Sequence, residues 1–261
     1  MKKILVPLIA TVMVLLAVLC FSKLIRERDE KIYTETRANI EGSSRVVEKE
    51  VEVVVDEEPI VDDEDDEFSK ELPESIMIDV PFLVQAPFGN WDEIHEDACE
   101  ESSLIMLEYY LRGDSGISLE DGEDEIQRLV SFQIRNYGSF EDTSVSETVE
   151  MARDFYGRDN LRVVYDFEKE RIREELAKGN PVILAVAGRE IGNPYFTPPG
   201  PWYHNIVLVG YDGDTIYAHD PGTRRGAKYP YNIDVLYEVS HDFTGKKEDI
   251  AKGRRAMIIV R

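Results

Sequence analysis

The chain has 261 residues, a formal net charge of -23 and a hydrophobic content of 43%. Once the chain ends are set aside, this leaves one domain of ordinary size with a substantial core. The strong negative charge argues against a nucleic-acid partner, because binding to phosphate depends mainly on lysine and arginine. There are two cysteines, and Cys20 falls in an apolar N-terminal run, so we expect no internal disulfide and a free thiol at Cys99.

Residues 4–21 are apolar with one exception and follow the basic start Lys2-Lys3. At ~1.5 Å per residue such a helix is ~27 Å long, close to the ~30 Å hydrocarbon core of a bilayer. No clean cleavage site of small residues follows, and Leu19 is large for the position before a lipidated Cys20. An uncleaved anchor is therefore favoured over cleavage or lipidation. The basic start predicts a single-pass protein of the cell membrane with an extracytoplasmic C-terminal domain.

Residues 23–72 form the next segment, which has few aromatic residues and is strongly acidic over residues 48–67. Such a stretch buries too little apolar surface to offset its chain entropy, so we expect a disordered linker. The run at residues 62–67 could bind calcium loosely, but a solvated tether explains it more simply. The predicted organisation is an anchor or signal segment (1–22), an acidic linker (23–72) and a globular domain (73–261).

The globular part alternates helical and strand patterns. Apolar runs predict strands at residues 76–80, 161–165, 181–186, 203–211, 215–219 and 256–260. Helical spacing and caps predict a helix that has Cys99 in its first turn and ends near Gly113, and further helices at residues 119–132, 144–155 and 168–177. Residues 82–95 and 188–201 are expected to be loops, and residues 233–239 fit either a helix or a strand.

Residues 97–111 read Asp-Ala-Cys-Glu-Glu-Ser-Ser-Leu-Ile-Met-Leu-Glu-Tyr-Tyr-Leu. The leucines recur at helical spacing, which predicts an amphipathic helix with Cys99 in its first turn. Asp97 is placed to cap the free N–H groups, and the positive end of the helix dipole favours a thiolate at Cys99. A small buried core cysteine is the simpler alternative. Gln85 upstream, with a histidine and an aspartate downstream, favours chemistry at this position.

The predicted hairpin at residues 203–219 brings His204 and Asp220 to its open end. If the turn is centred near residues 212–213, Asp220 falls within one or two residues of the position opposite His204. Cross-strand neighbours have Cβ atoms ~5 Å apart, so the carboxylate can hold an imidazole nitrogen. This contact supports an imidazolium, as the third group of a Cys-His-Asp triad does. The alternatives are an ordinary strand-end histidine and a simple turn.

Gln85 is the candidate oxyanion donor, together with the backbone N–H of Cys99, and a surface amide is its alternative. His95 is the rival base, but its four acidic neighbours suggest a solvated loop without a fixed partner. His219 alternates with Asp220 and should point to the other face of the sheet. No second thiol or regular histidine spacing accompanies Cys99, so we expect no metal site.

These motifs resemble those of the C39-like peptidases, a family of the papain-like superfamily. The matching segments are residues 80–85, Cys99 with its helix, and residues 179–183, 203–211 and 220–223. The resemblance implies an α+β papain-like cysteine peptidase fold, in which a helical part carrying the cysteine packs on an antiparallel sheet carrying the histidine and aspartate. It assigns the catalytic roles to Cys99, His204, Asp220 and Gln85. Many members have Cys-Gly-Pro where this chain has Cys-Glu-Glu, and two carboxylates there oppose thiolate formation.

Two functions are compatible with this pattern. The first is a membrane-tethered, outward-facing cysteine peptidase with a peptide or protein substrate, and a thiol amidase or acyltransferase is its close variant. The second is a non-catalytic module that binds a peptide in the same cleft without cutting it. The complete set of cysteine, histidine, aspartate and glutamine favours the first. Neither function calls for a cofactor.

Overall fold

The computed structural model describes residues 72–261. The predicted anchor, and the predicted linker apart from its last residue, lie outside the described residues. Within residues 72–261 no helix is both long and apolar enough to cross a bilayer.

Within residues 72–261, seven antiparallel strands form one sheet in the order β2-β7-β3-β4-β5-β6, and β1 pairs with β4 beside this path. The strands are β1 (Ser75–Met77), β2 (Leu161–Tyr165), β3 (Val182–Ala187), β4 (Tyr203–Asp212), β5 (Thr215–His219), β6 (Tyr229–Asn232) and β7 (Ala256–Val260). The sheet therefore joins strands from both ends of the domain, and β7 near the C-terminus lies between β2 and β3.

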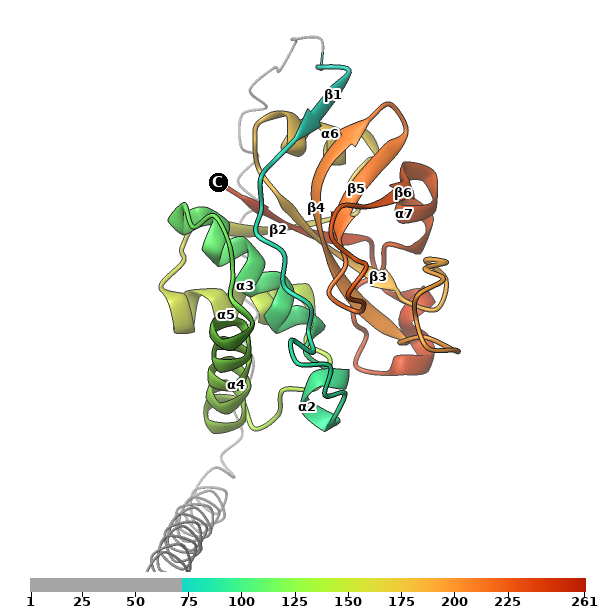
Figure 1. Ribbon diagram of the computed structural model, residues 1–261. Coiled ribbons are helices and arrows are strands. Elements are labelled where there is room, and N and C mark those ends of the chain that lie inside the picture. Colours follow the sequence, from blue (N-terminus) through green and yellow to red (C-terminus); the bar gives the residue numbers. More distant parts are fainter. Residues whose placement is uncertain (1–71) are drawn as a thin grey trace, which may run out of the picture. The chain divides into compact units, whose positions relative to one another are not determined.

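The helices are α2 (Glu93–Glu96), α3 (Cys99–Arg112), α4 (Leu119–Asn136), α5 (Val145–Tyr156), α6 (Glu170–Ala177) and α7 (Ile233–Val239), with a 3₁₀ helix at Lys247–Lys252. Helices α3, α4 and α5 pack on one another and lie together on one side of the sheet, where α3 contacts β3 and β4 (Figure 1). Helices α6 and α7 also contact the sheet. This mixed helical and antiparallel architecture confirms the expected α+β class.

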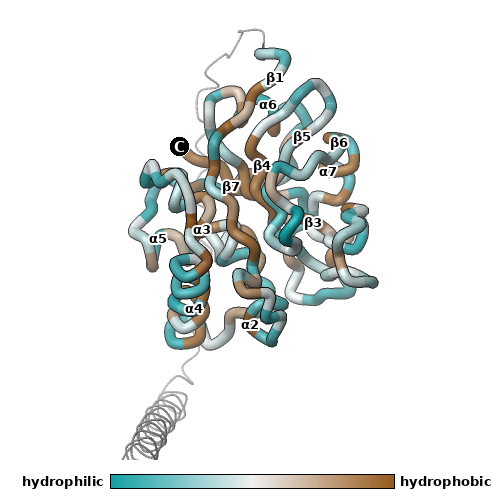
Figure 2. The backbone as a smooth tube through the Cα atoms, viewed as in Figure 1, coloured by the Kyte–Doolittle hydropathy of each residue, from teal (hydrophilic) through white to brown (hydrophobic). Residues whose placement is uncertain are grey.

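The core lies between α3 and the central strands. Strand β3 is buried along its whole length and β4 from Tyr203 to Tyr211, as expected for strands covered on both faces. Figure 2 shows hydrophobic residues gathered in these strands, whereas α4 has many hydrophilic residues along its length. Helix α3 is itself buried from Cys99 to Glu108, so its polar first turn is enclosed with the apolar remainder.

Several predicted element ends are confirmed by their caps. Ser144 caps α5 in a reciprocal capping box with Glu147. Gly113 closes α3 in the left-handed conformation, with a φ of 80° that favours glycine. The start of α3 differs from the prediction, because its N-cap is Ala98 and no side chain caps it. Asp97 is not the cap; its carboxylate lies 3.6 Å from the Lys247 ammonium.

Other elements also depart from the sequence prediction. The strand expected at residues 76–80 ends at Met77, although the Ile78 N–H still donates to the Val209 carbonyl at 2.7 Å. The chain then leaves the sheet toward Pro81, which has no N–H to continue the pairing. The loop expected at residues 82–95 contains the start of α2, and the ambiguous residues 233–239 form α7. Strand β6 was not predicted, because it is short and includes Pro230.

Candidate active site

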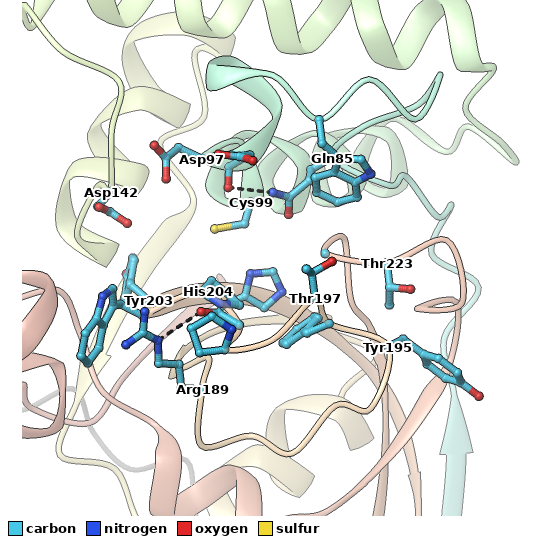
Figure 3. A pocket seen from close by; sticks show the side chains of 18 of the residues that line it. Gln85, Asp97, Cys99, Asp142, Arg189, Tyr195, Thr197, Tyr203, His204 and Thr223 are labelled. Carbon is cyan, nitrogen blue, oxygen red and sulfur yellow. Dashed lines mark hydrogen bonds between the residues drawn. The ribbon is translucent and has the colours of Figure 1, made fainter.

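A cavity of about 790 Å³ lies between the first turn of α3 and the start of β4. Cys99 and Gln85 line one wall, and His204, Arg189 and Thr197 line the opposite wall (Figure 3). Segments more than 100 residues apart in the sequence thus meet at one opening, because α3 packs directly on β4. The cavity brings three of the four predicted site residues to its surface, and the fourth, Asp220, lies behind His204.

Cys99 is the first residue of α3 and is 5% exposed. The adjoining turn is fixed on β4 by Ser103, whose hydroxyl donates to the Asn205 carbonyl at 3.2 Å. The thiol at the cavity wall is hydrogen-bonded to the Oε2 atom of Glu100, 3.0 Å from Sγ. Because Ala98 provides no side-chain cap, the first N–H groups of α3 are available to an anion in the cavity.

The electrostatic surroundings of this thiol oppose its ionisation. Burial and the charge of Glu100 raise the pKa of Cys99 well above its usual value, while the Asn205 backbone N–H acts in the opposite direction. Burial and the neighbouring Glu101 likewise raise the pKa of Glu100 well above that of an exposed glutamate. Burial raises the pKa of Glu101 to about 7, against the hydrogen bond from Gln133 that lowers it. Cys99, Glu100 and Glu101 in the first turn of α3 therefore keep their protons to a higher pH than exposed groups of the same kind.

His204 lies at the second position of β4 and is 1% exposed. Its Nε2 atom is 2.8 Å from Oδ1 of Asp220, which follows β5. A bulge between Leu208 and Gly210 shifts the β4–β5 register, and the carboxylate of Asp220 still reaches the imidazole. Since Nε2 faces the aspartate, the neutral ring donates from Nε2 and leaves Nδ1 as the acceptor.

Asp220 is fully buried and receives four hydrogen bonds. Oδ1 accepts from His204 and from the Gly222 N–H at 2.9 Å. Oδ2 accepts from the Tyr231 hydroxyl at 2.6 Å and from the Asn193 amide at 2.8 Å. Burial alone would raise the pKa of Asp220, but the His204 charge and these hydrogen bonds outweigh it and hold the pKa below its usual value. The carboxylate is therefore kept ionised beside the imidazole.

Asn193 and Tyr231 were missed by the sequence analysis. Asn193 lies in the loop after β3 and Tyr231 in β6, and each is nearly buried. The Asn193 amide also donates to the Tyr231 hydroxyl at 2.9 Å, so the two side chains hold each other as well as Asp220. No spacing in the sequence links these positions, because their contact depends on how the 188–201 loop folds over the end of the sheet.

Gly222 keeps the space beside the His204 ring open. A Cβ atom built on it would lie 2.8 Å from the Phe196 ring and 3.1 Å from Cε1 of His204. The Phe196 ring meets the imidazole edge to face, with ring centres 5.3 Å apart. The glycine thus permits an aromatic ring and the Asp220 carboxylate to confine the imidazole together.

Gln85 lines the cavity but its amide is engaged. Its Nε2 atom donates to the carbonyls of His95 at 2.8 Å and of Glu96 at 3.2 Å. Its backbone N–H donates to the Pro221 carbonyl at 2.9 Å, next to Asp220. Gln85 therefore ties α2 to the end of the hairpin, and an oxyanion role requires its amide to turn from these carbonyls toward the substrate.

His95 is not the solvated loop residue that the sequence suggested. It is 2% exposed in α2, with Nδ1 2.7 Å from Oδ1 of Asp92 and Nε2 3.0 Å from Oε2 of Glu123. The prediction of no fixed partner is wrong, because the imidazole lies between the carboxylate of Asp92, the N-cap of α2, and that of Glu123 on α4. His219 is likewise occupied outside the cavity, with Nε2 2.8 Å from the Val80 carbonyl.

Aromatic and charged side chains surround the opening. The aromatic members are Trp91, Tyr195, Phe196, Trp202 and Tyr203, and the charged members are Glu96, Asp97, Asp142, Arg189, Arg224, Arg225 and Lys247. The Arg189 guanidinium lies 3.4 Å from the centre of the Trp202 ring. The Arg225 guanidinium lies 4.8 Å from the centre of the Tyr195 ring. No carboxylate within residues 72–261 pairs with either arginine, so both keep N–H groups for the carbonyls or carboxylates of a ligand. Across the same residues, no group of three or more metal-binding side chains is found.

Comparison with known proteins identifies the family of this chain. The model of the Peptidase_C39 like family matches residues 77–246, more than half of the chain, and the chain therefore belongs to this family. A Bacillus anthracis protein assigned as a C39-like peptidase in its crystal structure matches with a TM-score of 0.49 and 15% identity. The match covers 72% of this chain and 98% of that one. No curated protein matches the chain.

Family membership and the observed elements define the α+β papain-like fold, with the cysteine at a helix N-terminus and the histidine on an antiparallel sheet. The recognition of the family from Cys99 with its helix and from the motifs at residues 80–85, 179–183, 203–211 and 220–223 is confirmed. Membership suggests a hydrolase of the cysteine peptidase type, with peptides or proteins as its substrates.

Proposed function

We propose that this protein is a membrane-tethered, outward-facing cysteine peptidase that hydrolyses peptide bonds with a Cys99-His204-Asp220 triad. The observation that carries the proposal is the buried contact of 2.8 Å between His204 Nε2 and Asp220 Oδ1, at a cavity that Cys99 also lines. This contact leaves Nδ1 to serve the thiol, and the four donors on Asp220 keep its negative charge in place. The apolar residues 4–21 support the tether.

In the proposed reaction the Cys99 proton passes to Nδ1 of His204, and the thiolate attacks the peptide carbonyl carbon. The resulting oxyanion is held by the free backbone N–H of Cys99 and by the Gln85 amide once it has turned from α2. The His204 imidazolium gives its proton to the leaving nitrogen, and an acyl-enzyme remains on Sγ. Water, deprotonated by the same imidazole, then releases the acid and restores the thiol.

A binding module on the same fold is the second candidate. It is favoured by the engaged amide of Gln85 and by the raised pKa of Cys99, since both describe a site at rest rather than one poised for attack. A thiol amidase or acyltransferase uses the same groups and differs only in the bond cut or in the acceptor of the acyl group.

The experiment compares hydrolysis of a mixed peptide library by the wild type with that by Cys99→Ala, His204→Ala and His241→Ala. We expect the first two variants to lose at least about a thousandfold in kcat/KM, because the thiol and its base act as one unit. His241, whose Nδ1 lies 2.9 Å from the Gly253 carbonyl outside the cavity, is the matched control and should retain activity. Library peptides that bind with equal affinity to the wild type and Cys99→Ala, and are never cut, would establish the binding module instead.

A further inference from the structure

The first turn of α3 contains a buried acid in direct contact with the reacting sulfur. Glu100 is 1% exposed, and its Oε2 atom lies 3.0 Å from Sγ of Cys99. Its other oxygen, Oε1, is buried and has no hydrogen-bond partner within the described part of the chain. An ionised carboxylate in this position would be a desolvated charge with one oxygen unsatisfied, which is among the costliest arrangements in a protein interior.

The groups that face Glu100 offer it no positive charge. On α3 these are Cys99 and Glu101, and from the loop before α5 the group is Asp142. Tyr203 faces it from β4 and is itself influenced by Asp242, which follows α7. All of these are neutral or negative. The nearby Lys247 ammonium is already taken, 2.7 Å from Asp142 and 3.6 Å from Asp97.

We infer that Glu100 acts as a neutral carboxylic acid in the productive state, and that its O–H group donates a hydrogen bond to the Cys99 thiolate. This inference rests on the proposed function and adds Glu100 to the groups that touch the reacting atom.

The proton count is consistent with this role. In the resting state the thiol and Glu100 each carry a proton and His204 is neutral. When the Sγ–H bond breaks, its proton forms a bond with Nδ1 of His204, and the Glu100 proton stays on its oxygen and turns toward the sulfur. The Cys99, His204 and Glu100 side chains taken together are neutral before and after this transfer, and Asp220 keeps its negative charge throughout. If Glu100 is ionised, the same transfer creates a thiolate 3.0 Å from a carboxylate, and the two charges repel.

This arrangement makes the reactivity of the cysteine depend on pH in a particular direction. The pKa of Glu100 is raised by burial and by Glu101, so the acid form persists above the ordinary range of a glutamate. As the pH rises through that raised pKa, the hydrogen-bond donor is lost and a repelling charge appears. Reactivity should therefore fall with rising pH, before the thiol ionises on its own at more alkaline pH.

The test measures the rate at which iodoacetamide, a small neutral reagent, alkylates Cys99 in the full chain across the acid-to-alkaline range. The variants are Glu100→Gln, which keeps an N–H donor and cannot ionise, and Glu190→Gln, an exposed matched control. We expect about a tenfold fall in the wild type and in the control as Glu100 loses its proton, which corresponds to one pKa unit of the thiol. Glu100→Gln should show no such fall. Superimposable profiles for the wild type and Glu100→Gln would overturn the inference.

A second measurement covers the case in which Glu100→Gln does not fold. The ¹³C resonance of the Glu100 carboxyl in the wild type should titrate well above the ordinary range of a glutamate, and it should move when Cys99 is alkylated. Titration in the ordinary range would also overturn the inference. Because neither measurement uses a peptide, a chain that meets both expectations but cuts no peptide refutes only the proposed function. If the wild type cuts peptides but its alkylation profile superimposes on that of Glu100→Gln, only the role of Glu100 is refuted.

Discussion

At the scale of single residues, the site contains two buried carboxyl groups with opposite behaviour: Asp220 is kept ionised, and Glu100 is kept protonated. Asp220 is fully buried yet ionised, because four donors converge on its two oxygens. Glu100 is equally buried, but it has the Cys99 sulfur as its partner and an unsatisfied Oε1. Burial raises the pKa of both carboxyl groups, but at Asp220 the charge of His204 and the four hydrogen bonds outweigh it, whereas at Glu100 the neighbouring Glu101 adds to it.

Tyr231→Phe tests how the ionised state of Asp220 is maintained. Removing the hydroxyl takes the 2.6 Å hydrogen bond from Oδ2 of Asp220, so the pKa of Asp220 should rise toward its ordinary value. The depressed pKa of Asp220 keeps its carboxylate ionised beside His204 until the pH falls through that pKa, and in the variant this loss of charge should begin at a higher pH. We expect about a tenfold lower kcat near the acid limb with little change in KM, because a hydrogen bond to a charged group contributes about 1.5–3 kcal/mol.

The measurement is the pH profile of peptide hydrolysis, with Tyr217→Phe on β5 as the control. Tyr217 does not line the cavity, so its variant should keep the wild-type acid limb. An unchanged limb in Tyr231→Phe would show that Asn193 and the Gly222 N–H suffice to hold Asp220.

At the scale of elements, the four-residue helix α2 connects the Gln85 side chain at the cavity to helix α4. Its carbonyls hold the Gln85 amide, and its His95 side chain connects it to Glu123 on α4. The sequence could not show this, because the acidic neighbours of His95 read as a solvated loop while the decisive partner lies 28 residues away. Long, regular elements such as α5 and β3 were predicted well, since their caps and apolar runs are local. The partners of Asp220 were not, since they come from a loop and a short edge strand.

His95→Ala should destabilise the domain rather than abolish the chemistry directly. We expect a loss of about 1–3 kcal/mol in the free energy of unfolding, the usual cost of leaving buried polar groups unpaired. Denaturant unfolding of His95→Ala, Glu123→Gln and the double variant gives the coupling between α2 and α4. Additive losses would mean that the 3.0 Å contact contributes nothing to stability.

Ionisation of Glu101, in the first turn of α3, should make the stability of the folded protein depend on pH. The folded-state pKa of Glu101 is about 7, raised by burial from its ordinary 4.5, so the fold favours the neutral acid. The stabilisation is fully present below the ordinary pKa and is lost as the pH rises through about 7. Glu101→Gln cannot ionise, and we expect it to be more stable than the wild type in alkaline solution by about 3 kcal/mol, because the pKa rises from 4.5 to about 7 and each pKa unit is worth about 1.36 kcal/mol.

Thermal unfolding of Glu101→Gln, the wild type and Glu190→Gln across this range provides the check. The advantage of Glu101→Gln should shrink toward acid pH, where both proteins carry a neutral group, and the exposed Glu190→Gln control should follow the wild type throughout. A constant offset between Glu101→Gln and the wild type would mean that the Gln133 contact, and not ionisation, sets the difference.

At the scale of the whole molecule, the sequence predicts a division between a tethering segment and an independent domain. The family match begins at residue 77, and the sheet already includes β1 at Ser75–Met77. The central strands, α3 and the cavity are all built from residues 72–261, and their core is closed by β7 near the C-terminus. The net charge of -23 is concentrated in part in the acidic residues 48–67, which the predicted core does not need.

A fragment of residues 72–261 should therefore melt cooperatively at the same temperature as the full chain in detergent. Its N-terminal residues reach the sheet edge through the Pro73 carbonyl, which accepts from the Tyr211 hydroxyl at 2.8 Å, so a start at residue 72 keeps that contact. A fragment starting at residue 80 removes β1 and exposes one edge of β4, and we expect it to melt several degrees lower, as for a loss of about 1 kcal/mol or more. Calorimetry of the three proteins, at equal ionic strength to screen the acidic segment, makes the comparison. A melting temperature of the 72–261 fragment well below that of the full chain would mean that residues 1–71 stabilise the domain, and the predicted boundary between linker and domain would then have to move toward the N-terminus.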